Sequence, residues 1–157
     1  MDYSNIRIYN LPPQSTAFVG RQSELFDIVS RFQDENCRLL TLVGSGGTGK
    51  TRLAIESIQH LIESDFEHGV FYVPLAPLTS ADSIVTTIIN ILSIVINEDG
   101  TPKDELLKFL SQRNLLLVMD NFEHVLEGVD IVADILKNTD RVKILATSRE
   151  TLNLSIE

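Results

Sequence analysis

A glycine-rich segment, residues 44–51, carries the side chains with the clearest chemical potential. Gly44, Gly49, Lys50 and Thr51 fit the pattern G-x-x-x-x-G-K-[ST], with an apolar run before it and a helical pattern after it. Glycines let the backbone N–H groups turn toward a phosphate, and the N-terminus of the following helix attracts the same anion. Lysine can reach the β and γ phosphates, and the threonine hydroxyl can coordinate Mg²⁺. This segment, called the phosphate loop below, therefore predicts a nucleoside triphosphate site.

Two further polar side chains follow apolar runs, where strands are expected to end. Asp120 comes directly after the run 115–119, and Arg149 follows the run 143–146. Ligands of open α/β sheets bind at the carboxyl ends of the strands. An aspartate there can organise Mg²⁺, and an arginine can contact a γ-phosphate with its fixed charge. The alternative interpretations are a helix-capping carboxylate for Asp120 and a surface arginine for Arg149.

Glu123 is the nearest carboxylate after Asp120 that could polarise an attacking water. A solvated acidic residue at the start of a helix explains Glu123 at least as well. His124, the next residue, is more typical of packing or capping than of catalysis. The identity of a water-activating acid therefore stays open.

The composition is that of one globular domain. The 157 residues are 43% hydrophobic and 22% charged, which is ordinary for a chain that buries a core. The formal net charge is −9, with 13 Lys and Arg against 22 Asp and Glu. Because duplex-binding proteins carry a basic face, direct contact with nucleic acid is not expected of this segment.

The cysteine content and the apolar stretches favour a cytoplasmic protein. Cys37 is the single cysteine, so an internal disulfide is excluded, and a small buried side chain in a reducing compartment is expected. The N-terminus lacks the basic and apolar regions of a signal peptide. The most apolar stretch, 84–96, is interrupted by polar residues and is too short to span a bilayer. No membrane contact is therefore expected.

Apolar runs alternate with helical patterns along most of the chain. Two prolines predict an extended N-terminal lead-in over residues 1–16. Buried strands are expected at 39–43, 70–73, 115–119 and 143–146. Helices are expected at about 22–33, after the phosphate loop, at about 81–96, from 102, and at about 126–137. This alternation predicts an α/β fold, a three-layer P-loop NTPase fold with a mainly parallel sheet of about four to five strands flanked by helices.

Four blocks, in order, carry a resemblance to a known family. They are Phe18-Val19-Gly20-Arg21 with Glu24, the phosphate loop, Leu115 to His124, and Ile144 to Arg149. Together they resemble the nucleotide-binding core of the STAND class of signalling ATPases, and most closely the NB-ARC-like modules of large bacterial transcriptional regulators. The resemblance covers about residues 10–157. It implies a P-loop NTPase core over 17–157, with the 143–146 strand between the 39–43 and 115–119 strands.

The resemblance also implies a role for each matched position. Adenine would be held by Val19, Gly20 and Arg21. The phosphates would lie in a cradle formed by Gly44, Gly46, Gly47, Thr48, Gly49, Lys50, Thr51 and Arg52. Thr51 and Asp120 would hold Mg²⁺, and Arg149 would sense the γ-phosphate of ATP. Glu123 is left as the candidate water-activating acid, since Asn121 stands where many relatives have a second acidic residue.

Members of that family contain parts that lie beyond the position of Glu157. These parts are a further strand, a helical lid and a winged-helix domain, so the chain is expected to be a core truncated at its C-terminal end. Without the lid and winged-helix domains, we expect weak binding of ATP or ADP and very slow hydrolysis. If the further strand normally flanks 39–43, that strand becomes an exposed edge through which copies of the chain can self-associate.

The predicted function is the ATP- and ADP-binding core of a signal-transduction switch that regulates transcription through domains absent from this chain. A small P-loop kinase or phosphotransferase is one alternative. It would need a second-substrate site and an arginine-rich lid, and the stretch after Asp120 shows neither. A module that binds nucleotide without hydrolysis is another. An interaction module with a non-functional phosphate loop is disfavoured, because Lys50, Thr51 and Asp120 are all present.

Overall fold

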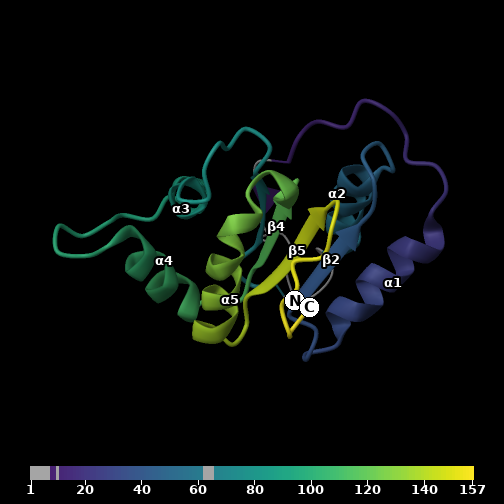
Figure 1. Cartoon of the computed structure of the whole chain (residues 1–157). Coiled ribbons are helices and arrows are strands. Elements are labelled where there is room, and N and C mark those ends of the chain that lie inside the picture. The colour runs from purple at the N-terminus through teal and green to yellow at the C-terminus, as the bar shows by residue number, and fades with distance from the viewer. Residues whose placement is uncertain (1–7, 10, 62–65) are drawn as a thin grey trace.

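Five parallel strands form one sheet in the computed structural model, which describes residues 8–9, 11–61 and 66–157 (Figure 1). The strand order is β1-β3-β4-β5-β2. The strands are β1 (Ile8–Tyr9), β2 (Leu39–Val43), β3 (Val70–Pro74), β4 (Leu116–Asp120) and β5 (Lys143–Ser148). β5 pairs with β2 on one side and with β4 on the other, which confirms the expected place of the 143–146 strand.

Helices cover both faces of this sheet and make a three-layer α/β fold (Figure 1). They are α1 (Gln22–Gln33), α2 (Lys50–Leu61), α3 (Ser83–Leu92), α4 (Pro102–Ser111) and α5 (Val129–Asn138), with short 3₁₀ helices η1 (Phe122–His124) and η2 (Leu126–Gly128). One apolar core joins α1 and α2 to one face of the sheet, and a second core joins α3, α4 and α5 to the other. The predicted fold class is therefore confirmed.

Alternation along the strands divides their side chains between the two cores. Leu116 and Val118 of β4 pack in the α1–α2 core, and Leu117 and Met119 pack in the α3–α5 core. By the same period of two, Asp120 at the end of β4 belongs to the face covered by α2. The register of the sheet therefore decides which polar side chains meet the start of α2.

Several elements differ from expectation in detail. The lead-in contains β1, a strand of two residues that pairs with β3, while residues 1–7 and 10 lie outside the described residues. Helix α3 ends at Leu92 rather than near 96, because Ser93 adopts a left-handed backbone (φ 53) and the Ile94 N–H donates to the Ile89 carbonyl. Cys37 is half-buried instead of buried.

The start of α4 follows the predicted pattern. Thr101 accepts a hydrogen bond from the Asp104 N–H, and Pro102 occupies the first turn of the helix. In the described residues, no helix combines the length and apolar character that crossing a membrane requires.

Candidate functional site

The phosphate loop connects β2 to α2 at the carboxyl edge of the sheet. Gly47 and Gly49 have φ of 79° and 80°, a left-handed backbone that favours glycine. A Cβ on Gly44 would lie 3.0 Å from Thr48 Oγ1. The Thr48 hydroxyl donates to the Ser45 carbonyl at 2.8 Å, which closes the loop on itself. The loop is therefore shaped by the glycines that the sequence pattern singled out.

The Lys50 side chain folds back onto the first residues of this loop. Its Nζ donates to the carbonyls of Gly44 and Ser45 at 2.7 and 2.9 Å. Lys50 is also the first residue of α2, so its charge adds to the positive end of the helix dipole. The loop therefore presents a concentrated positive charge where a phosphate can bind.

Thr51 and Asp120 meet directly below the loop. Thr51 Oγ1 donates to Asp120 Oδ1 at 2.7 Å, and Asp120 is 3% exposed. A hydroxyl and a carboxylate are the hard oxygen donors that Mg²⁺ prefers, and Mg²⁺ at phosphates takes only one or two protein ligands. These two residues therefore fit a magnesium ion. In the described part of the chain no group of three His, Cys, Asp or Glu residues could hold a metal.

Arg149 and Glu123 flank the other side of the loop. Arg149 Nε lies 3.6 Å from Glu123 Oε1, and the side chains are 64% and 12% exposed. A Cβ placed on Gly46 would lie 3.4 Å from a terminal nitrogen of Arg149, so the guanidinium lies against the loop. Glu123 Oε2 is buried and has no hydrogen-bond partner among the described residues. This carboxylate therefore keeps acceptor capacity beside the phosphate loop.

The N-terminal block contacts the phosphate loop from the α1 side. Gly20 and Arg21 both have a left-handed backbone, with φ of 82° and 58°. Arg21 donates to the Thr48 carbonyl at 2.7 Å and to Glu24 at 3.2 Å. The Val19 side chain is 86% exposed. Arg21 thus connects α1 to the phosphate loop by hydrogen bonds, while Val19 presents an apolar surface beside the loop.

Arg52 anchors the lead-in to α2. Its guanidinium donates to Thr16 Oγ1 at 3.2 Å and also to the Thr16 carbonyl. Residues 16–19, Arg21, Arg52 and the loop line a shallow cavity of about 370 Å³. A larger cavity of about 660 Å³ lies between the loop, the lead-in, η1 and Arg149. The two cavities meet at Gly47, Gly49 and Arg52.

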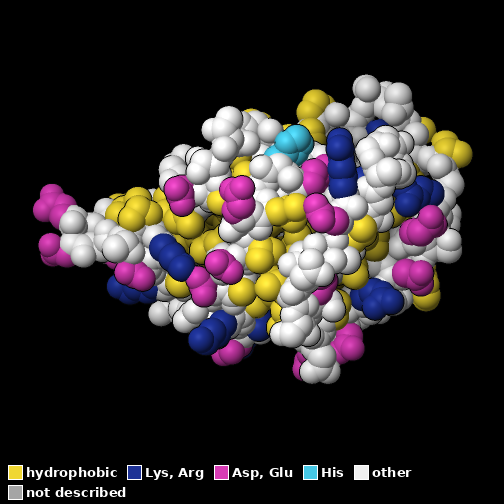
Figure 2. Space-filling model, in the orientation of Figure 1, with side chains coloured by type: hydrophobic (Ala, Val, Ile, Leu, Met, Phe, Trp, Pro, Cys, Tyr) yellow, Lys and Arg dark blue, Asp and Glu magenta, His cyan; other side chains and the backbone are white. Residues whose placement is uncertain are grey.

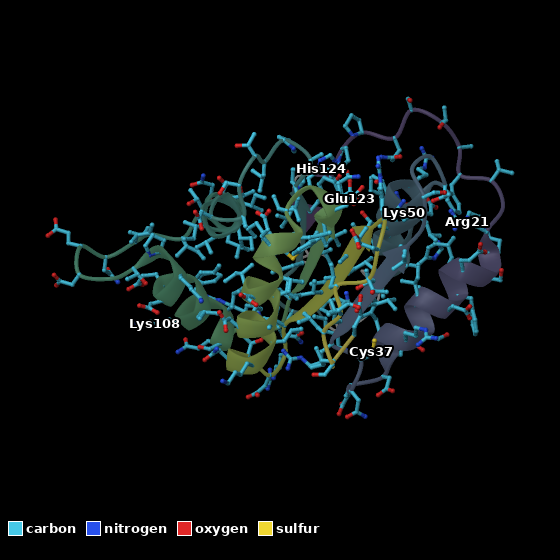
Figure 3. All side chains as sticks on the ribbon, in the orientation of Figure 1. Arg21, Cys37, Lys50, Lys108, Glu123 and His124 are labelled. Carbon is cyan, nitrogen blue, oxygen red and sulfur yellow. The ribbon has the colours of Figure 1, made fainter. Side chains whose placement is uncertain are left out.

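The structure brings the predicted site residues to one edge of the sheet. Figure 3 shows Arg21, Lys50, Glu123 and His124 along this edge, with Cys37 near the opposite end. Figure 2 shows basic and acidic side chains beside a histidine in the upper part of the molecule. The parallel sheet explains the clustering, since every β-to-α connection of this kind emerges at the carboxyl ends of the strands.

Two residues with no assigned role also reach this site. The Tyr72 hydroxyl donates to Asp120 Oδ2 at 2.8 Å, and the Thr147 hydroxyl donates to Asp120 Oδ1 at 2.6 Å. Burial, and then the adjacent Asp120 carboxylate, raise the pKa of Tyr72 above its usual range. Thr147 could be noticed at the end of its strand, but Tyr72 lies within an apolar run that gives no such signal.

Comparison with known proteins identifies the family. The profile described as NB-ARC domain matches residues 21–153. An uncharacterized protein of Mycobacterium tuberculosis is 34% identical over 143 residues, which cover 90% of this chain and 36% of that protein. Another protein of the same organism, named as an HTH-type transcriptional regulator, is 36% identical over 121 residues, which cover 76% of this chain and 13% of that protein. This chain therefore spans about a third or less of the length of these relatives.

Among solved structures, the ADP form of the ORC2 protein of Aeropyrum pernix aligns with a TM-score of 0.65 at 18% sequence identity. The alignment covers 98% of this chain and 46% of that one. This likeness supports the same fold. Since the family profile covers most of its residues, the chain belongs to the NB-ARC family of nucleotide-binding domains.

Proposed function

We propose that this NB-ARC domain binds ATP or ADP with Mg²⁺ at the carboxyl edge of its sheet and is the nucleotide-dependent switch of a larger protein. The observation that carries the proposal is the hydrogen bond of 2.7 Å from Thr51 Oγ1 to Asp120 Oδ1. It joins the first turn of α2 to the end of β4, directly below a loop shaped to hold phosphates. Anion-binding and cation-binding groups are thus adjacent, as a magnesium nucleotide requires.

The phosphate loop and α2 bind the phosphates in this proposal. Gly44, Gly46, Gly47, Thr48 and Gly49 supply backbone N–H groups, and the side chains of Lys50 and Arg52 supply positive charge. Lys50 then exchanges its bonds with the Gly44 and Ser45 carbonyls for bonds with phosphate oxygens. Mg²⁺, held by Thr51 and Asp120, neutralises charge on the phosphates when it is bound.

Arg149 distinguishes ATP from ADP. Its guanidinium lies against Gly46 and is paired with Glu123. A γ-phosphate competes with Glu123 for Arg149, whereas ADP has no group in that position. A ligand shifts a conformational equilibrium only through such differential contacts, so Arg149 is the residue that makes the domain a switch.

The adenine ring occupies the shallow cavity beside the loop. Val19 supplies an exposed apolar surface, Gly20 allows the close turn of the chain, and Arg21 holds the loop in place through the Thr48 carbonyl. The cavity is open to solvent along one side. We therefore propose weak binding to this domain alone, with further enclosure supplied by a lid domain of the larger protein.

Hydrolysis by this domain is very slow in the proposal. Asn121 carries no charge, so Glu123 is the acid left to polarise a water, and its Oε2 has acceptor capacity. However, Glu123 Oε1 already faces Arg149, which weakens it as a base. Efficient hydrolysis then depends on domains beyond this one.

The free edge of the sheet supports self-association. Arg38 and Gly44 make backbone hydrogen bonds with β5, so the alternating backbone groups of Leu39, Thr41 and Val43 point away from it. β2 is the last strand of the sheet in the described residues. Such an edge pairs with another strand, and we propose a second copy of this chain as the partner.

The larger protein regulates transcription in the cytoplasm according to this proposal. Its support is the relative named as an HTH-type transcriptional regulator and the greater length of the relatives. With a net charge of −9, this segment does not contact nucleic acid itself. A winged-helix domain elsewhere in the protein is the proposed partner of the nucleotide switch.

Titration with a fluorescent ADP analogue in the presence of Mg²⁺ tests the nucleotide site. We expect a micromolar Kd, competition by ATP and ADP rather than GTP, and binding at least about tenfold weaker in Lys50→Ala, a loss of about 1.4 kcal/mol. Lys108→Ala is the matched control, because Lys108 is an exposed lysine of α4 far from the loop (Figure 3). Equal affinities of wild type and Lys50→Ala contradict the proposal, and a nanomolar Kd contradicts the open site.

A further inference from the structure

The Asp120 carboxylate is held by three hydroxyl groups from separate parts of the chain. Thr51 and Thr147 donate to Oδ1 at 2.7 and 2.6 Å, and Tyr72 donates to Oδ2 at 2.8 Å. Asp120, Tyr72 and Thr147 are 3%, 7% and 0% exposed. The carboxylate is therefore oriented by protein donors on both of its oxygens.

The donor direction of Thr147 is set by a second contact. The Asn121 N–H donates to Thr147 Oγ1 at 2.9 Å, so that contact uses a lone pair of the hydroxyl. A threonine hydroxyl has one proton, which is then directed to Asp120. Thr147 thus joins the carboxylate to the backbone at the start of η1.

Tyr72 reaches the carboxylate from the neighbouring strand. It packs in the α1–α2 core with Val70 and Val118, on the face to which Asp120 belongs, and Pro74 pairs with Asp120 in the sheet register. A phenylalanine would fill the same apolar space. The hydroxyl of Tyr72 adds the hydrogen bond to Asp120 Oδ2, which a phenylalanine cannot make.

We propose that Tyr72 and Thr147 are positioning residues of the metal site. The terminal torsion of an aspartate has broad minima, so the plane of an unrestrained carboxylate can tilt away from Thr51. Tyr72 on Oδ2 and Thr147 on Oδ1 restrict this rotation and keep an oxygen of the carboxylate toward Thr51. This inference rests on the proposed function, since it concerns how the same site receives Mg²⁺.

The test compares ADP binding with Mg²⁺ and with EDTA. Outer-sphere partners of metal ligands commonly contribute 10- to 100-fold to metal affinity. For Tyr72→Phe we therefore expect the gain in ADP affinity on adding Mg²⁺ to fall about tenfold, with the affinity in EDTA unchanged. Ser57→Ala is the matched control, because it removes a fully buried hydroxyl that donates to the Ala54 carbonyl within α2. We expect both affinities of Ser57→Ala to equal those of wild type.

Thr147→Val provides a second variant, because it removes the donor on Oδ1 and nearly keeps the shape of the side chain. It should reduce the Mg²⁺-dependent gain in the same way, and circular dichroism establishes that each variant is folded. The inference is overturned if both variants keep the wild-type gain, if they lose affinity equally in EDTA, or if both fail to fold. Wild type that binds ADP without any effect of Mg²⁺ refutes the metal site itself, and wild type that does not bind ADP refutes the proposed function.

Discussion

Arg149 Nε lies 3.6 Å from Glu123 Oε1, so the arginine after β5 is paired with the acid of η1 beside the phosphate loop. The pair joins two segments that follow neighbouring strands. It places the guanidinium against Gly46, where the last phosphate of a nucleotide is expected. Glu123 thus competes for Arg149 with the γ-phosphate that this arginine is proposed to sense.

Glu123→Gln should favour ATP over ADP. Removing the acid releases Arg149 for the γ-phosphate, and a partly exposed ion pair is worth about 0–1 kcal/mol. We expect the ratio of affinities for a non-hydrolysable ATP analogue and for ADP to rise about two- to fivefold. Glu127→Gln, an exposed glutamate of η2, should leave the ratio as in wild type. An unchanged ratio in Glu123→Gln is evidence against the competition.

Gly128→Ala should destabilise the fold without affecting the site. A Cβ on Gly128 would overlap the Ile84 side chain and lie 3.2 Å from Ala81 Cβ, and Ile84 is fully buried. Overpacking of this kind costs about 1–3 kcal/mol, measurable by urea denaturation. In Gly100→Ala the new Cβ would meet the end of the Glu105 side chain at 2.6 Å. Since that side chain can move aside, Gly100→Ala should cost less, and equal costs would contradict the packing argument.

The stability of the protein should fall at alkaline pH partly through Tyr72. Burial and then Asp120 raise the pKa of Tyr72 above its ordinary value of about 10. The unfolded chain therefore releases this proton at a lower pH than the folded protein does. The contribution of Tyr72 to the free energy of unfolding is complete below about pH 10 and is lost as the pH rises, by up to about 1.4 kcal/mol per pH unit.

Urea denaturation of wild type and Tyr72→Phe at about pH 9 and about pH 11 measures this contribution. The stability advantage of wild type should shrink at the higher pH. A difference that stays constant means that Tyr72 titrates alike in the folded and unfolded protein.

Thr41→Pro should block association through β2. The Thr41 N–H points away from β5, so proline there removes an edge donor and leaves the β2–β5 ladder intact. We expect wild type to form concentration-dependent oligomers in light-scattering chromatography and Thr41→Pro to remain monomeric. Thr41→Val keeps the N–H and should associate like wild type. Monomeric wild type at all concentrations argues against the edge as an interface.

The strands and the phosphate loop could be predicted because their signals are local. The length and apolar character of the run 39–43 predict β2 at its observed bounds, and those of the run 115–119 predict β4, which the structure places one residue later at Leu116–Asp120. The glycine spacing of the phosphate loop is specific. The clustering of Lys50, Asp120 and Arg149 followed from a parallel sheet. The ion pair of Arg149 with Glu123 did not follow, since it depends on how η1 turns after Asn121, whose backbone is left-handed at φ 62.

Tyr72 shows why the rest of the site escapes a reading of the sequence. It lies inside the apolar run 70–73, where every residue is simply expected to be buried. Whether its hydroxyl reaches Asp120 depends on the register of β3 against β4, a non-local property. The end of α3 was missed for a local reason, because serine rarely adopts the left-handed backbone that Ser93 has there.

The alternation of side chains along the strands ties the chemistry of the site to correct strand pairing. Tyr72, Asp120 and Thr147 meet because each stands at a position of its strand, β3, β4 or β5, whose side chain lies on the face of the sheet covered by α2. A shift of β4 by one residue would turn Asp120 toward α5 and bring the apolar Met119 to the start of α2. A compact but mispaired chain would therefore keep its phosphate loop and lose the acid that we propose for the Mg²⁺ site, so the proposed Mg²⁺-dependent nucleotide binding would report on native register.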